Sequence, residues 1–346
     1  GLRQENSRFG FNAGEVTYSG IGFENDWVML QYGRGKENWS AGEGIQISLS
    51  NESASYDYGV AEFKYKSYKT RYFHGWLERI DSTNRYVTGK SIEWNSGKNF
   101  VASLSEIIIY SGKDRQIDLS YLNPLSSHLE VELNKRQNII SSNGHSNAIW
   151  QIALDMFMKK NLRISMNFVI DELILDKIES QSGKNNALAH SLRLAWSPKK
   201  KIIPLIVYYQ YMNTGTNTFK HENGFNNFVQ RDFPLGSTLG NDALETKFGL
   251  IFYNLKNYIF DLQYGFNQIG EKNLFYGMYK PNLDYEKGKF PSGNVVDSSF
   301  IKFKFIKLIS NISTLSIEGG WNFNNKSNGS FVFKTELYYG LDLNSL

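Results

Sequence analysis

The stretch NAIWQIALDMFMKKNLRISMNFVID, residues 147–171, contains two segments of alternating side-chain character on either side of the polar break at residues 159–161. In the second segment one face carries Leu162, Ile164, Met166, Phe168 and Ile170, and the other carries Arg163, Ser165, Asn167 and Asp171. A period of two residues is the period of a β-strand. Each segment also has roughly the 9–11 residues that a tilted strand needs to cross a bilayer. We therefore interpret the stretch as a transmembrane β-hairpin.

The composition of the whole chain agrees with a membrane protein built from strands. Aromatic residues make up 15% of the 346 residues, whereas charged residues make up 21% and the mean hydropathy is −0.42. A strand-built membrane protein accommodates these values because alternate residues face a polar lumen and the long loops are hydrophilic. The longest apolar run, Ile202 to Tyr209, contains Pro204 and is too short for a spanning helix.

Several classes of protein are disfavoured by the same composition. Cysteine is absent, which excludes disulfides and thiolate metal sites. The net charge of +4 is small and there is no basic stripe with interleaved aromatics, so nucleic acid is not an expected partner. The chain starts at Gly1 without an apolar signal region, and we expect a single barrel domain over 1–346 that lacks an N-terminal portion of the full-length protein.

The lengths of the connections predict the topology. Alternating or aromatic-rich segments lie near 8–19, 24–33, 43–50, 59–68, 71–80, 85–95, 100–110, 147–158, 162–171, 187–197, 203–213, 244–255, 257–268, 299–308, 312–323 and 330–343. From Glu93 onward short connections (95–99, 159–161, 197–201, 254–256, 307–311) alternate with longer ones (111–146, 172–186, 213–242, 268–298, 324–330). Outer-membrane barrels have short periplasmic turns and long extracellular loops. The pattern predicts a large antiparallel transmembrane β-barrel, with a soluble β-sandwich or jelly roll as the alternative.

One segment departs from strand patterning. In Tyr121–Arg136, Pro124 precedes leucines and charged residues at helical spacing, and Pro is favoured in the first turn of a helix. We expect a short helix near 121–136 that folds over or into the mouth of the barrel.

Five strings carry a family resemblance: YFHGWL (72–77), NRYVTGKSIEW (84–94), SEIIIYSG (105–112), YLNPL (121–125) and FPLGSTLGNDALE (233–245). In this order, and with GRGKENWSAGEG (33–44) before them, they resemble the capsule assembly Wzi family of outer-membrane proteins. The resemblance implies a barrel of about eighteen strands with a polar lumen. It also implies a surface lectin that holds exported capsular polysaccharide, a lumen obstructed by inserted segments, and helical material on the periplasmic side.

The candidate polysaccharide-binding residues are three aromatics and two cations. Trp39, Trp76 and Tyr110 are suited to stacking on sugar rings, although an interfacial girdle or a packed wall also accounts for Trp76 and Tyr110. Lys220 and Arg231 lie in the long 213–242 connection, where they are suited to pairing with uronate or other acidic groups.

A second set of charged residues lies on predicted strands and is expected to form a polar network in the lumen: Arg85, Glu93, Glu106, Arg163 and Asp171. They either contact sugar or anchor a plugging loop, or they only satisfy the polar wall of the barrel, which we favour because barrel interiors are polar by default.

The sequence does not indicate an enzyme. The five histidines show no metal-ligand spacing and no G-x-S-x-G motif is present, so we expect no catalytic residues, no metal and no cofactor. We expect a monomeric outer-membrane protein of a Gram-negative bacterium whose partners are membrane lipid and a capsular or exopolysaccharide. The alternatives are a porin-like channel and a soluble carbohydrate-binding sandwich.

Overall fold

A fifteen-stranded antiparallel sheet dominates the computed structural model, which describes residues 7–8, 11–12, 16–137, 146–174, 185–198, 204–254, 257–275, 288–310, 313–325 and 329–339. Its strands are β3 (Ser19–Glu24), β4 (Val28–Gly35), β5 (Tyr56–Tyr65), β6 (Tyr68–Trp76), β7 (Thr83–Asn95), β8 (Phe100–Lys113), β9 (Ser146–Lys159), β10 (Leu162–Glu172), β11 (Ala187–Trp196), β12 (Leu205–Thr214), β15 (Ala243–Asn254), β16 (Tyr258–Ile269), β17 (Val296–Ser310), β18 (Ser313–Asn324) and β19 (Ser330–Tyr339). The other elements are the pairs β1 (Ser7–Arg8) with β2 (Phe11–Asn12) and β13 (Val229–Gln230) with β14 (Phe233–Pro234), the helices α1 (Leu119–Leu122) and α2 (His128–Leu133), and the 3₁₀ turn η1 (Gly224–Asn226).

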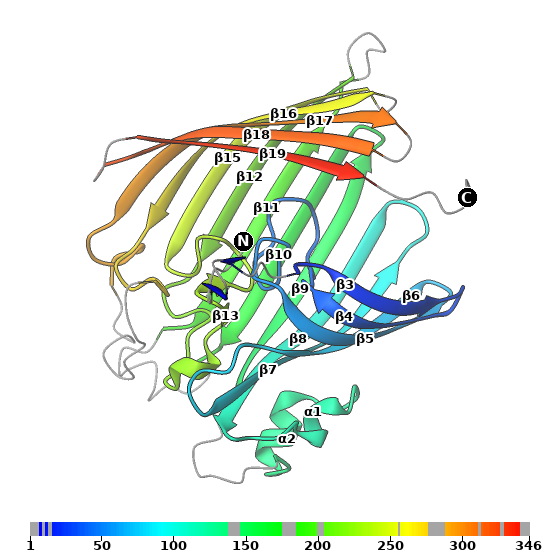
Figure 1. Ribbon diagram of the computed structural model, residues 1–346, viewed down its shortest axis with the longest axis vertical. Helices are drawn as coiled ribbons and strands as arrows, with labels where there is room; N and C mark the ends of the chain where they lie inside the picture. The colour runs from blue at the N-terminus through cyan, green and yellow to red at the C-terminus, as the bar shows by residue number, and fades with distance from the viewer. Residues whose placement is uncertain are drawn as a thin grey trace.

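Within the sheet each strand pairs with the next sheet strand along the chain, and the whole sheet curves around the segments that fold inside it (Figure 1). Short turns such as residues 160–161 therefore lie at one end of the wall, and long connections such as 215–242 lie at the other. This arrangement confirms the all-β antiparallel barrel fold. Short turns mark the periplasmic end and long loops the extracellular end.

The hairpin at 147–171 forms as predicted, with β9 and β10 paired over most of their length. Met166 and Phe168 are exposed on the outer face of β10, whereas Ser165 and Asn167 are each 1% exposed and point into the barrel. Polar residues face inward here because they meet polar groups of a segment inside the lumen, and apolar residues face outward because they meet lipid.

The strand predicted at 43–50 is wrong. These residues belong to the connection between β4 and β5, which folds inside the barrel and forms no strand. Ile45, Ile47 and Leu49 alternate with polar residues because this extended chain packs apolar side chains into an interior cluster and hydrogen-bonds the wall between them. Of the strand predicted at 8–19, residues 9–10 and 13–15 lie outside the described residues; the described part contains the short strand β2, and β3 begins at Ser19.

The helical segment near 121–136 is present as α1 and α2, with Pro124 between them. The expectation that it covers or enters the mouth is wrong, because the two helices lie on the outer face of the wall beside β7 and β8 (Figure 1). Tyr121 of α1 packs 4.9 Å, ring centre to ring centre, from Tyr110 on the outer face of β8. Ser127 caps α2 by accepting a hydrogen bond from the Glu130 N–H. Neither helix of the described residues has the length and apolar character needed to cross a membrane.

Candidate functional site: a filled lumen and a rim groove

The connection between β4 and β5, residues 36–55, is the first inner segment, and wall side chains hold its backbone inside the barrel. The Asn167 amide accepts a hydrogen bond from the Ala41 N–H at 2.7 Å and donates to the Ala41 and Ile45 carbonyls. The Ser191 hydroxyl also donates to the Ile45 carbonyl, at 2.8 Å. Arg193, which lies on β11 with Ser191, donates to the Glu43 carbonyl. These bonds satisfy backbone groups of a segment that forms no strand or helix of its own.

A second inner segment, residues 215–242 between β12 and β15, lies against the first. The Ser50 N–H donates to the Leu235 carbonyl at 2.8 Å, and the Ser237 N–H donates to the Ile47 carbonyl at 3.0 Å. Across the lumen, the Arg85 guanidinium donates to the carbonyls of three residues of this segment, Phe225, Asn227 and Val229. The second inner segment is therefore tied to both the first inner segment and the opposite wall.

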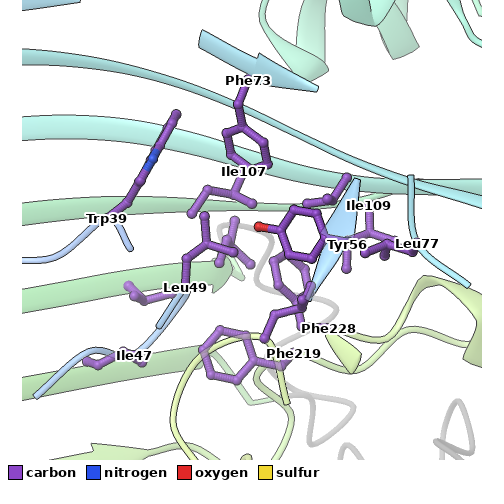
Figure 2. Close-up of a cluster of buried hydrophobic side chains, with 14 of the residues drawn as sticks. Trp39, Ile47, Leu49, Tyr56, Phe73, Leu77, Ile107, Ile109, Phe219 and Phe228 are labelled. Carbon is purple, nitrogen blue, oxygen red and sulfur yellow. The ribbon is translucent and has the colours of Figure 1, made fainter. Parts of the chain in front are cut away.

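The space between the two inner segments and the wall is filled by apolar side chains. Figure 2 shows Trp39, Ile47 and Leu49 of the first inner segment, Phe219 and Phe228 of the second, and the wall residues Tyr56, Phe73, Ile107 and Ile109 in one cluster. Several of these side chains have no exposed surface. An interior packed in this way behaves as a protein core, and its wall residues come from β5 to β12.

Below this cluster, towards the short turns, lies a polar cavity of about 720 Å³ between the first inner segment and strands β6 to β10. Its lining carries four cationic and four anionic side chains, among which Arg71 pairs with Glu37 at 3.0 Å and Lys69 with Glu93 at 3.1 Å. Burial lowers the pKa of Lys36 in the same cavity, and Glu52 nearby opposes that effect. Because its charges are compensated, the cavity has the properties of a hydrated vestibule rather than of a site for a charged ligand.

Four of the five predicted lumen residues face the interior of the barrel, in two groups. Arg85 and Asp171 anchor the second inner segment, because Asp171 accepts a hydrogen bond from the Phe219 N–H. Glu93 and Arg163 line the vestibule, where Arg163 pairs with Asp155.

The assignment of Glu106 to the lumen is wrong, because it lies on the outer face of β8. There it pairs with Lys90 at 3.3 Å and accepts hydrogen bonds from the His128 N–H and the Trp150 indole. The outer surface at this point is covered by the segment that carries α2, so a charged pair is sheltered from lipid.

The predicted aromatic ligands do not share one site. Trp39 lies in the first inner segment with its edge towards Phe73 at 5.0 Å, and its indole N–H donates to Glu37. Trp76 and Tyr110 are on the outer face of the wall. Tyr110 is fully buried beneath α1 and lies close to the His74 ring.

The two predicted cations both lie in the second inner segment. The Lys220 ammonium group is buried and donates to the Lys272 carbonyl, which ties the second inner segment to the connection between β16 and β17. Arg231 is half-buried in the turn between β13 and β14, and its backbone N–H donates to Glu78 at 2.7 Å.

A groove of about 650 Å³ lies on the outer face at the extracellular end of β15 to β18. We define this rim groove by two rows of side chains. One row, along paired positions of adjacent strands, is Phe266, Ser299 and Phe323. The row beyond it is Gln268, Asp297 and Asn325, in which the amides of Gln268 and Asn325 both donate to the Asp297 carboxylate.

Sequence reasoning missed the rim groove, although a signal was present. In both FNQ (266–268) and FNN (323–325) an outward aromatic is followed two residues later by an outward amide. The connection predicted at 268–298 includes Asp297, whereas β17 begins at Val296. Only the strand pairing shows that these residues are neighbours.

No family model and no curated protein matches the sequence. The structure is similar to that of Wzi, an outer membrane protein involved in group 1 capsule assembly in Escherichia coli and a carbohydrate-binding β-barrel. The TM-score is 0.66 at 11% identity, over 91% of this chain and 68% of that chain. The Pseudomonas aeruginosa outer membrane protein OprD gives 0.48 at 11% identity, over 90% of this chain and 75% of that one. OccD3 of the same organism gives 0.47 at 8% identity, over 94% and 78%.

The strand topology, the exposed apolar face of the wall and the likeness to Wzi define the class: the protein has the fold of an outer-membrane β-barrel. Within this class it has two connections folded into its lumen and packed there as a core.

Proposed function

We propose that the protein is an outer-membrane surface lectin that binds or anchors capsular or other exported polysaccharide and assists capsule assembly. The observation that carries this proposal is the filled lumen. A wide barrel with a polar, open lumen conducts ions and solutes. In this protein two inner segments and an apolar cluster occupy that space, which favours a role at the extracellular surface over transport.

The inner segments also give the extracellular end a rigid foundation. Asp242, at the end of the second inner segment, accepts hydrogen bonds from the Lys272 and Ser292 N–H groups of the β16–β17 connection. Asn273 donates to the Leu239 carbonyl at 2.7 Å. Loops held in one conformation lose less entropy on binding than mobile ones, so these contacts suit a surface that binds a polymer.

Two measurements on the purified barrel test the proposal. Beads coupled to capsular or exopolysaccharide of the source bacterium should retain the detergent-solubilised protein, and beads without polysaccharide should not. In planar bilayers the same preparation should stay silent. Large, steady, open currents together with an absence of retention would establish a porin-like channel instead.

We further propose that the protein binds without catalysing a reaction. The arrangement nearest to a hydrolytic site is on the outer face, where His128 pairs with Glu132 at 3.2 Å. The Ser146 hydroxyl donates to Glu132 and bonds Tyr121, and among the described residues it forms no hydrogen bond with His128. A serine nucleophile needs a base within hydrogen-bond reach. Incubation with polysaccharide should therefore release no reducing ends and leave polymer length unchanged.

A further inference from the structure

The rim groove has the dimensions of a sugar ring. Phe266, Ser299 and Phe323 occupy paired positions on three adjacent strands, so the two phenyl side chains are separated by two strand spacings, or about 10 Å. Both rings are nearly half exposed, whereas Ser299 between them is small. The two rings therefore flank a hollow whose floor is the Ser299 side chain. A pyranose ring placed there presents its C–H faces to the aromatic side chains.

The row beyond the rings supplies hydrogen-bonding groups of both kinds. Gln268 donates to Asp297 at 2.8 Å, and Asn325 donates to the other carboxylate oxygen at 3.4 Å. These bonds fix the carboxylate and leave it able to accept further bonds, because an ionised carboxylate has about four acceptor positions. Sugar hydroxyl groups complement such a set.

The charge of the groove selects among saccharides. Among the described residues that line the groove, Asp297 is the one ionisable side chain, and none of them is a cation. A negative charge in a partly desolvated groove repels phosphate and uronate groups. Hydroxyl groups, in contrast, donate to a carboxylate in short charge-assisted bonds.

We propose that the rim groove is a saccharide-binding subsite for an uncharged sugar ring of the exported polysaccharide. The ring lies between Phe266 and Phe323, and its hydroxyl groups donate to Asp297. This inference rests on the proposed function and gives it a location: the polymer is held at the outer edge of the barrel, where the wall meets the outer leaflet, rather than above the lumen.

Two substitutions test the groove without touching the inner segments. Ser299→Phe fills the hollow with a side chain that strands accommodate well, and Asp297→Asn removes the charge while keeping the shape. The matched controls are Ile301→Phe, at the next outward position of the same strand, and Asp57→Asn, an outward carboxylate on β5 that pairs with Arg34. Heat-modifiable migration on gels confirms that all four variants fold.

The readout is the affinity of the detergent-solubilised protein for a panel of uncharged and uronate-containing bacterial polysaccharides coupled to beads. Wild type and both controls should bind the uncharged polymers, and Ser299→Phe and Asp297→Asn should bind them about tenfold more weakly or worse. Equal binding by all five proteins overturns the assignment of the groove as a saccharide subsite and leaves the proposed function standing. An absence of binding by wild type overturns both the assignment and the proposed function. If the two groove variants lose binding only to vesicles that contain lipopolysaccharide, the occupant is a membrane glycolipid and the assignment to the polymer is wrong.

Discussion

Asn167 on β10 and Arg85 on β7 hold the inner segments in the lumen, and both use side chains to bond backbone groups of these segments. The alternation of β10 predicted that Asn167 faces inward, and the same reasoning placed Arg85 in the lumen. What the side chains meet there was not predictable, because their partners lie more than a hundred residues away in the chain. From sequence we favoured a role of Arg85 in the polar wall alone, whereas in the structure its guanidinium bonds the backbone of an inserted loop.

Replacement of Arg85 should loosen the second inner segment. Arg85→Gln cannot reach all three carbonyls, and each buried acceptor left unsatisfied costs about 1–3 kcal/mol. We expect faster hydrogen exchange over residues 219–229 and a lower midpoint for heat-modifiable migration. Arg79→Gln is the control, because Arg79 and its partner Asp114 are both more than half exposed and such surface pairs contribute about 0–1 kcal/mol. Equal effects of the two substitutions would contradict the anchoring role.

The error at Glu106 has a physical cause at the same scale. It precedes the apolar run Ile107, Ile108 and Ile109, which hides the strand alternation. The run is apolar on both faces because Ile107 and Ile109 pack in the interior cluster, whereas Ile108 packs beneath the outer helices. A strand buried on both sides does not reveal from sequence which face is inside.

Among the elements, the first inner segment and the α1–α2 segment are both long connections on the extracellular side, yet one enters the barrel and the other covers its outside. The sequence predicted a strand for part of the first inner segment, since Ile45, Ile47 and Leu49 alternate as a strand does. An extended chain packed between two walls shows the same period as a strand in a sheet. Periodicity therefore reports alternating environments and does not require a hydrogen-bonded ladder.

Removal of the first inner segment should open the barrel to ions. Gly35 and Tyr56 are paired at the ends of β4 and β5, so a two-residue Asn-Gly turn can replace residues 36–55. We expect this variant to show currents in planar bilayers where wild type is silent, because the deletion joins the vestibule to the space around the second inner segment. The matched control replaces residues 119–133 with a Gly-Ser linker. That segment lies outside the wall, and its removal should leave the barrel silent.

At the scale of the whole molecule, the proposed lectin holds a long polymer through many copies of a weak site. The fold and the membrane location were predictable from strand length, alternation and loop lengths, because these follow from the thickness of the bilayer. The rim groove was not, because it depends on the register of β16, β17 and β18.

Retention of polysaccharide should depend on how many barrels share one membrane. A polymer that meets several barrels binds by effective concentration, and its retention should exceed that of a single-repeat oligosaccharide by on the order of a hundredfold. Liposomes carrying many barrels should show this difference, and nanodiscs carrying one barrel should show much less of it. A difference of the same size in both preparations would argue against multivalent retention.

The long sequence separations within the filled lumen also determine when it can form. Ala41 bonds a partner 126 residues later in the chain, and Gly44 accepts a hydrogen bond from Lys247, 203 residues later. Contacts so distant form slowly, because the intervening chain must first be ordered. Residues 36–55 therefore leave the ribosome early, and they complete their set of contacts only after β15 has joined the wall. During biogenesis the nascent barrel passes through a stage with a vacant lumen and an unbound apolar segment, which chaperones and the insertion machinery must protect from misassembly.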